Sequence, residues 1–281
     1  QAEDGIRDRS PSRGLGDVYK RQQLLSARAM CTLFILSAIY LYLMFFDANY
    51  FLIYLLAGGT AVIIGLFCWI SIPHFEDSVV QKKSLFLRRQ YSLYYLLTFL
   101  AGARRQIFVV FAGFLMVEKF GFPIENVVLL TLVNAALTFW LAPKIGALIS
   151  YIGERRALTL EYIGLIIIFL SYAFVDNIAV AIVLYLLDHL FFAMAIAIKT
   201  YFQKIADPAD IAATSSISFT INHIAAVILP ALLGFLWVIN HSAVFLVGAA
   251  IAVGSLVVTQ FIPDQPKQGQ ETRWFYREKP T

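Results

Sequence analysis

Residues 177–204 read NIAVAIVLYLLDHLFFAMAIAIKTYFQK, and this long run of mainly apolar residues decides the fold class. A helix that spans the hydrocarbon core of a bilayer needs about 20 mainly apolar residues, which this run supplies. Two adjacent ionisable residues, Asp188 and His189, stand near its middle. Because ionisable side chains inside a membrane are costly, we interpret the run as a transmembrane helix that carries part of a functional site.

The composition of the whole chain also favours a polytopic membrane protein. Of the 281 residues, 60% are apolar and only 14% are charged, and the mean hydropathy is +0.74. Soluble domains carry about 25% charged residues, so this chain has too few charges to cover its apolar surface in water. The composition argues against a soluble enzyme and a nucleic-acid-binding domain, and the net charge of +4 is small for a polyanion partner.

Seven further apolar runs predict an all-α integral membrane protein with eight transmembrane helices. The expected spans are 24–46, 49–73, 91–117, 124–150, 156–175, 177–204, 209–238 and 241–263. A membrane β-barrel is a poorer interpretation, because these runs are too long for barrel strands and do not alternate. The polar loop 74–90 divides a two-helix unit, residues 23–73, from a six-helix bundle, residues 91–263, and residues 264–281 form a polar tail.

Residues 1–22 differ from the rest of the chain, because they are polar, rich in Gly and Arg, and lack the apolar core of a secretory signal. Back-translation of residues 1–8 and 12–22 gives sequences that resemble a sequencing-library adapter. A native disordered tail is the alternative interpretation. We expect the segment to be an artefact, the reading frame to begin within a gene, and upstream sequence to be missing.

The distribution of lysine and arginine predicts the orientation. With eight spans, nearly all basic loop residues lie on one side of the membrane, and the other side holds only Lys119. Cytoplasmic loops carry an excess of Lys and Arg, so both chain ends are expected in the cytoplasm.

Polar side chains inside the predicted spans come from four helices at similar depth. They are Arg104, Arg105, Gln106, Asn134, Asp188, His189, Asn222 and His223. We predict that they form one polar site that binds substrate or protons. Simpler structural roles remain open: either arginine could form an ion pair with Asp188, and Asn134 or His223 could form hydrogen bonds between helices.

Motifs for cofactors and metals do not occur in the sequence. We find no phosphate loop, dinucleotide fingerprint, HExxH or GxSxG. Cys31 and Cys68 lie in apolar runs and fit neither a disulfide framework nor a metal site. We therefore expect no cofactor, no metal, no nucleic-acid partner and no enzymatic activity.

Residues 146–158, GALISYIGERRAL, resemble the cytoplasmic loop signature of the major facilitator superfamily, G-x-L-x-D-R-x-G-R-R-x-x-L. The matching positions are Gly146, Leu148, Gly153, Arg155 and Leu158. Ser150 and Tyr151 replace the usual Asp-Arg pair, and Glu154 replaces a basic residue. The alternative interpretation is a short basic turn on the cytoplasmic side.

The resemblance implies a helical bundle of twelve transmembrane helices in two halves, of which this chain holds helices five to twelve. The loop 74–90 would be the central cytoplasmic loop. Such a protein is a secondary transporter, here closest to bacterial members without an assigned substrate, and we expect a monomer in the inner (plasma) membrane. The resemblance also implies a cytoplasmic gate formed by Gly146, Gly153, Arg155 and Arg156.

The expected function is alternating-access transport of a small solute coupled to H⁺. Asp188, with His189 or His223, would carry the proton, and the arginine pair favours an anionic or zwitterionic solute. Two alternatives are an integral-membrane enzyme, such as a lipid-modifying transferase that uses Asp188 and His223, and a facilitator-like sensor that does not transport.

Overall fold

The computed structural model describes residues 30–46, 49–71 and 87–273. Within these ranges the chain is helical apart from short connections and an isolated β-bridge between Lys267 and Gln270. The all-α prediction is therefore confirmed for the described part of the chain. Residues 1–22, most of the loop 74–90 and the end of the polar tail lie outside the described residues.

Seven helices are long and apolar enough to cross a membrane, as expected of a multi-pass membrane protein. They are α2 (Tyr50–Ser71), α3 (Ser92–Gln106, within the span Arg89–Lys119), α4 (Ile124–Ile152), α5 (Glu154–Phe174), α6 and α7 (Ile178–Phe192 and Ile196–Ile205, within the span Ile178–Ile205), α8 (Ile211–Ile239, within the span Pro208–Ile239) and α9 (His241–Thr259). The described part of the first predicted span is a shorter apolar helix, Met30–Phe45.

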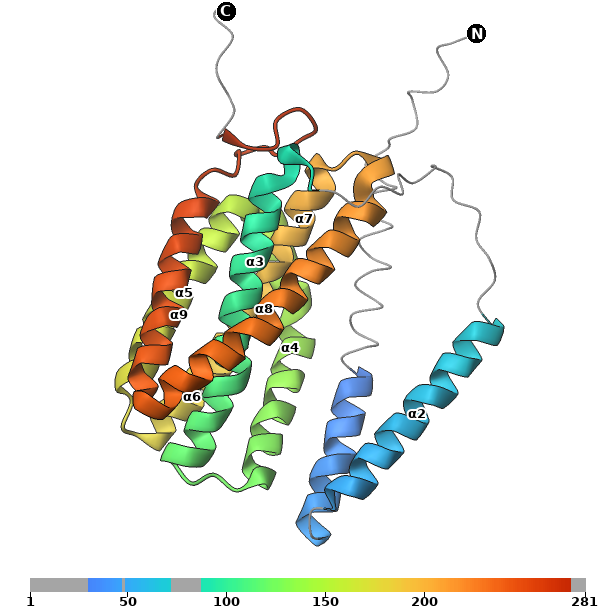
Figure 1. Ribbon diagram of the computed structural model, residues 1–281, viewed down its shortest axis with the longest axis vertical. Coiled ribbons are helices and arrows are strands. Elements are labelled where there is room, and N and C mark those ends of the chain that lie inside the picture. The colour runs from blue at the N-terminus through green and yellow to red at the C-terminus, as the bar shows by residue number, and fades with distance from the viewer. Residues whose placement is uncertain (1–29, 47–48, 72–86, 274–281) are drawn as a thin grey trace, which may run out of the picture.

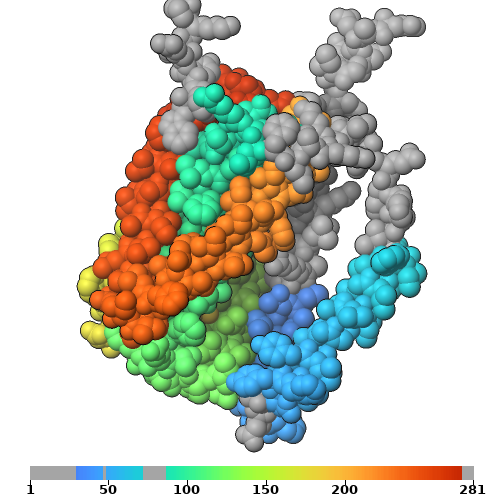
Figure 2. Space-filling model, viewed as in Figure 1, coloured from blue at the N-terminus to red at the C-terminus, as the bar shows by residue number. Residues whose placement is uncertain are grey.

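Helices α3 to α9 pack into one bundle (Figure 1). The most extensive contacts join α5 to α9 and α3 to α8, and α3 also contacts α9 and α7. Figure 2 shows α8 crossing one face of this bundle beside α3. Helix α2 buries none of its residues, and Figure 1 draws it apart from the bundle.

Local sequence explains where the helices begin and end. Gly153 separates α4 from α5 with a φ of 83°, a conformation that L side chains rarely adopt. The side chain of Asn177 caps α6 by accepting hydrogen bonds from the amides of Ala179 and Val180, at 2.8 and 3.3 Å. Asn240 caps α9 in the same way.

Two spans depart from α geometry within five residues after Arg104 and Asp188, respectively. Helix α3 continues after Gln106 as a π-helix, η2 (Ile107–Ala112), and a second π-helix, η3 (Leu115–Lys119), ends the span. Between α6 and α7 lies a short 3₁₀ helix, η4 (Ala193–Ala195). Both kinds of irregularity recur at functional sites and hinges in helical proteins.

Candidate functional site

Three charged side chains are fully buried where α3, α5 and α6 meet. Arg104 Nη2 lies 3.5 Å from Glu161 Oε1, and its guanidinium carbon lies 4.2 Å from the ring centroid of Tyr162. Asp188 interacts electrostatically with both Arg104 and Glu161, but neither of its oxygens has a hydrogen-bond partner among the described residues. Arg104, Glu161 and Asp188 are each 0% exposed, and we refer to them as the buried charge cluster.

The charges of this cluster do not balance when all three groups are ionised. Arg104 lies at ion-pair distance from Glu161, whereas Asp188 lies beyond that distance, and the three fully buried groups together carry one net negative charge. An uncompensated charge in a dry interior is unfavourable by several kcal/mol. A proton on one of the two carboxylates makes the cluster neutral, so its chemistry suits the uptake and release of one proton.

Glu161 is the member of the buried charge cluster that was not among the site residues predicted from the sequence. Arg104 forms its ion pair with Glu161 rather than with Asp188. The available signal was that Glu161 is the only acidic or basic residue in its apolar run after Arg156. Charged residues inside an apolar span are functional candidates, so that signal would have sufficed to include it.

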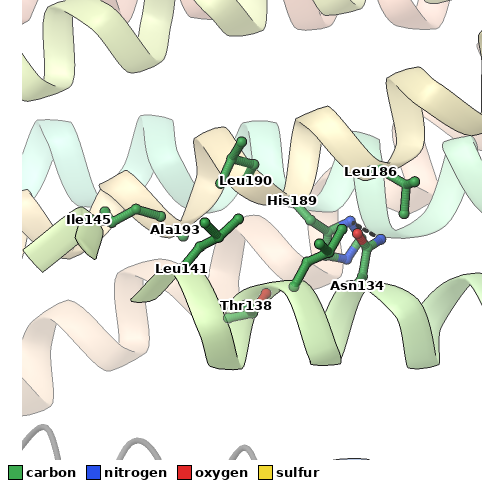
Figure 3. Close-up of a pocket in the computed structure, with 9 residues that line it drawn as sticks. Asn134, Thr138, Leu141, Ile145, Leu186, His189, Leu190 and Ala193 are labelled. Atoms are coloured by element: carbon green, nitrogen blue, oxygen red, sulfur yellow. Dashed lines mark hydrogen bonds between the residues drawn. The ribbon is translucent and has the colours of Figure 1, made fainter. Parts of the chain in front are cut away.

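A second polar group joins α4 to α6. Asn134 Nδ2 lies 2.8 Å from His189 Nδ1 and donates a hydrogen bond to the Tyr185 carbonyl oxygen at 3.4 Å. His189 Nδ1 is also 3.1 Å from that carbonyl oxygen. Both side chains line a hollow between the two helices, shown in Figure 3. The other lining residues are Leu137, Thr138, Leu141, Ile145, Leu186, Leu190 and Ala193.

The two adjacent arginines of α3 have different surroundings. Arg104 is buried in the charge cluster, whereas Arg105 is exposed and Gln106 is partly exposed. Arg105 has no ion-pair partner within the described ranges, and it interacts electrostatically with His189. This division follows from helix geometry, because consecutive side chains point about 100° apart.

No hydrogen bond or ion pair in the described ranges joins the polar side chains of α8 to Asp188. Thr220 Oγ1 donates to the Ser216 carbonyl oxygen, and His223 Nδ1 lies 2.9 Å from the Phe219 carbonyl oxygen, so both bond to their own helix. His223 is exposed. Asn222 lies against α3, where a Cβ on Gly102 would be 2.4 Å from Asn222 Oδ1. Among the candidate residues, the structure therefore joins Asn134 to His189 and places Asn222 against α3, whereas His223 contacts its own helix.

Of the expected gate residues, Gly153, Arg155 and Arg156 lie at the α4–α5 connection. Arg155 forms an ion pair at 2.5 Å with Asp264 of the segment after α9, and the neighbouring Glu154 pairs with Lys204 of α7 at 2.5 Å. Arg156 is exposed. These contacts connect parts of the same bundle. Gly146 lies within α4, and a Cβ added there would have no atom within 4 Å, so the packing does not require glycine at this position.

We predict opposite outcomes for alanine at Gly153, in the connection, and at Gly146, within α4. Gly153→Ala forces an L residue into a conformation with φ of 83° and ψ of 159°, at an expected loss of about 1–3 kcal/mol in unfolding free energy. Gly146→Ala should be neutral or stabilise by up to about 1 kcal/mol, because alanine is the better helix former. Thermal unfolding of the two variants in detergent compares them; equal effects would contradict the argument.

Metal-binding arrangements of three or more His, Cys, Asp or Glu side chains do not occur in the parts of the chain that the structure describes. The buried charge cluster and the Asn134–His189 pair are two polar features inside the described part of the bundle. Compared with known proteins, the sequence matches no family model and no curated protein.

Proposed function

We propose that this chain belongs to a secondary active transporter of the major facilitator type, which moves a small solute by alternating access coupled to protons. The observation that carries the proposal is the exposed side chain of Arg105, halfway along the span Arg89–Lys119. A guanidinium that faces lipid at this depth costs at least about 2.5–3.5 kcal/mol. The face that contains Arg105 is therefore better suited to water or to another part of the protein than to lipid.

Exposed polar residues on the neighbouring helix support a water-filled path along this face. Helix α8, which packs extensively on α3, exposes a row of hydroxyls and one imidazole: Ser215, Ser216, Thr220 and His223. Polar side chains at membrane depth usually face a bundle interior or a wet cavity. A water-filled solute pathway lined by α3 and α8 provides the water that hydrates these polar side chains.

The buried charge cluster supports proton coupling. One member, Arg104, directly precedes Arg105 in the sequence, and the cluster becomes neutral when one proton binds to Asp188 or Glu161. The π-helix after Gln106 and the 3₁₀ helix Ala193–Ala195 interrupt the two helices that carry Arg104 and Asp188. Interrupted helices at midplane sites are a recurring feature of secondary transporters, so a change of protonation can be linked to helix movement.

Within this proposal the bundle α3 to α9 is the second half of a facilitator, and the Met30–Phe45 helix and α2 are the last two helices of the first half. The eight predicted spans are then helices five to twelve. A transferase that uses Asp188 and His223 together is less well supported, because Asp188 is fully buried on α6 and His223 is exposed on α8.

The test of the water-filled path is thiol labelling from the aqueous phase. In a background with Cys31 and Cys68 replaced by serine, Arg105→Cys should react with a membrane-impermeant methanethiosulfonate at least about tenfold faster than Ile167→Cys. Ile167 is the matched control, because it is exposed in the middle of α5 but has only apolar neighbours in sequence. Equal, slow labelling of both cysteines would contradict the pathway.

Transport itself is tested with the gene extended through any coding sequence upstream of residue 23. The protein is reconstituted into vesicles with an imposed pH gradient, and a panel of labelled organic anions, cations and neutral solutes is offered. The expected result is uptake of at least one solute that collapses when a protonophore dissipates the gradient. No gradient-dependent flux for any class of solute would overturn the proposal.

A further inference from the structure

We propose that the segment after α9, residues 264–273, restrains α7, and that this restraint is released when α7 moves during transport. We call the segment the C-terminal strap; in Figure 1 it is the red segment that runs from α9 across the end of the bundle. The inference rests on the proposed transport function for the movement of α7, whereas the restraint itself is argued from contacts within the bundle. The strap is the described part of the polar tail that the sequence predicts.

The strap folds back on itself instead of extending from the bundle. Its chain turns at Gly269, which has a φ of 83°, and the isolated β-bridge described above lies at this turn. The amide of Arg273 then donates a hydrogen bond of 2.9 Å to the carbonyl oxygen of Phe261, so the strap returns to the end of α9. Pro266 and Thr272 are buried. Chain ends are ordered where such contacts hold them, so the strap is a structural element of the bundle.

Two hydrogen bonds join the strap to the end of α7. Gln268 Nε2 donates to the carbonyl oxygen of Ala206 at 2.6 Å, and the hydroxyl of Tyr201 donates to the carbonyl oxygen of Glu271. Ala206 is 3% exposed and Tyr201 is 0% exposed. Ala206 directly follows α7, and the last carbonyl groups of a helix have no partner within the helix. The strap therefore supplies a hydrogen bond that α7 cannot make for itself.

The strap also binds the beginning of α5. Asp264 forms its ion pair with Arg155 of α5 and another with Arg273 at the far end of the strap. Helix α7 is joined to the same part of α5 by the ion pair between Lys204 and Glu154. The strap, α7 and the beginning of α5 thus form a closed ring of contacts. The end of α7 cannot move away from α5 unless the strap releases one of the two helices.

Helix α7 is the part of this ring that is built to move. It is ten residues long and is separated from α6 by the 3₁₀ helix Ala193–Ala195, and such an interruption often marks a hinge. On α3 it packs through Phe202, whose ring stacks on Tyr94 with the centroids 4.3 Å apart. Unlike α3 and α5, the strap lies outside the apolar spans, so it can detach without displacing a spanning helix. Segments with few buried contacts are the ones that open locally in folded proteins.

The first experiment measures how fast a cysteine at the end of α7 reacts with a membrane-impermeant methanethiosulfonate in nanodiscs. Cys31 and Cys68 are replaced by serine, and Ala206→Cys keeps the backbone carbonyl that accepts from Gln268. Adding Tyr201→Phe and Gln268→Ala removes both hydrogen bonds between the strap and α7. Labelling should then become at least about tenfold faster, because each hydrogen bond contributes to the closed state.

Lys267→Gln is the matched control for this labelling. Lys267 is an exposed residue of the strap, and its hydrogen bond within the strap uses its backbone carbonyl oxygen, which the substitution keeps. Labelling of Ala206→Cys in this variant should proceed at the parent rate. Equal labelling in the parent and in the variant that combines Tyr201→Phe with Gln268→Ala would overturn the restraint, because the strap would then not protect the end of α7.

A second experiment closes the restraint covalently. In the extended gene used for the transport assay, Ala206→Cys and Gln268→Cys are joined by a bifunctional methanethiosulfonate. The crosslink should lower solute flux at least about tenfold, because a gating element that cannot open limits turnover, and a reductant should restore the flux. Each single-cysteine variant treated with the same reagent should keep its flux. Parent-level flux in the crosslinked protein would overturn the release step.

The two experiments separate this inference from the transport proposal. Proton-driven flux of a solute, together with labelling of position 206 that the strap variants do not change, would overturn the restraint and support transport. Faster labelling in the strap variants, together with no flux of any solute before crosslinking, would support the restraint and overturn transport together with the release step.

Discussion

Asp188→Asn is expected to abolish solute uptake driven by a pH gradient while it leaves solute exchange at equal pH intact. In the parent protein one buried guanidinium accompanies two buried carboxylates, so the cluster has one net negative charge when all three groups are ionised and is neutral when one carboxylate binds a proton. The variant leaves Arg104 and Glu161 as a neutral pair with no reason to bind a proton in a dry site. Without a proton-binding group the pH gradient cannot drive uptake, whereas solute exchange at equal pH requires no net proton movement.

The measurement compares uptake and counterflow in the same vesicle preparation. Asp176→Asn is the matched control, since Asp176 is an exposed aspartate in the connection between α5 and α6, where it pairs with Lys119 at 2.7 Å. It should retain both activities. Proton-driven uptake by Asp188→Asn at the parent rate would remove Asp188 from the coupling mechanism.

The helices were predictable because they depend on local composition. In a bilayer, a run of about 20 apolar residues satisfies its backbone hydrogen bonds by forming a helix. The apolar runs alone therefore predict the bounds of α2 to α9 within a few residues. The interruptions were not predictable in this way. Residues 193–195 are Ala, Met and Ala, which fit an α-helix as well as the 3₁₀ turn that they form.

The partners of the polar residues depend on packing between helices, which sequence periodicity does not determine. The 100° spacing predicts that Arg104 and Arg105 point in different directions, but the neighbours of α3 decide which one is buried. Glu161 lies two turns into α5 and Arg104 about four turns into its span, so counting residues places them at different depths. The long arginine side chain and the relative placement of the two helices nevertheless bring them within 3.5 Å.

Arg104→Met is expected to lower the free energy of unfolding by about 3–5 kcal/mol, the usual effect of removing one partner from a buried ion pair. Glu161 and Asp188 are then two fully buried carboxylates without a cation. Methionine has a similar length and adds no charge, so the loss reports electrostatics more than packing. Arg105→Met, the adjacent and exposed arginine, should change stability by no more than about 0.5 kcal/mol.

A double-mutant cycle then tests whether Glu161 is the partner that matters. If the ion pair at 3.5 Å is the main interaction of Arg104, Glu161→Leu added to Arg104→Met should recover stability, because it removes the carboxylate that lost its cation. The double variant should therefore unfold at a higher temperature than Arg104→Met alone. Strictly additive losses would show that Arg104 acts instead through its stacking on Tyr162, which lies 4.2 Å from the guanidinium carbon. If Arg104→Met is additive with Glu161→Leu but coupled to Asp188→Asn, then Asp188 of α6 is the main ion-pair partner of Arg104. The proton site would then involve Arg104 and Asp188 without α5.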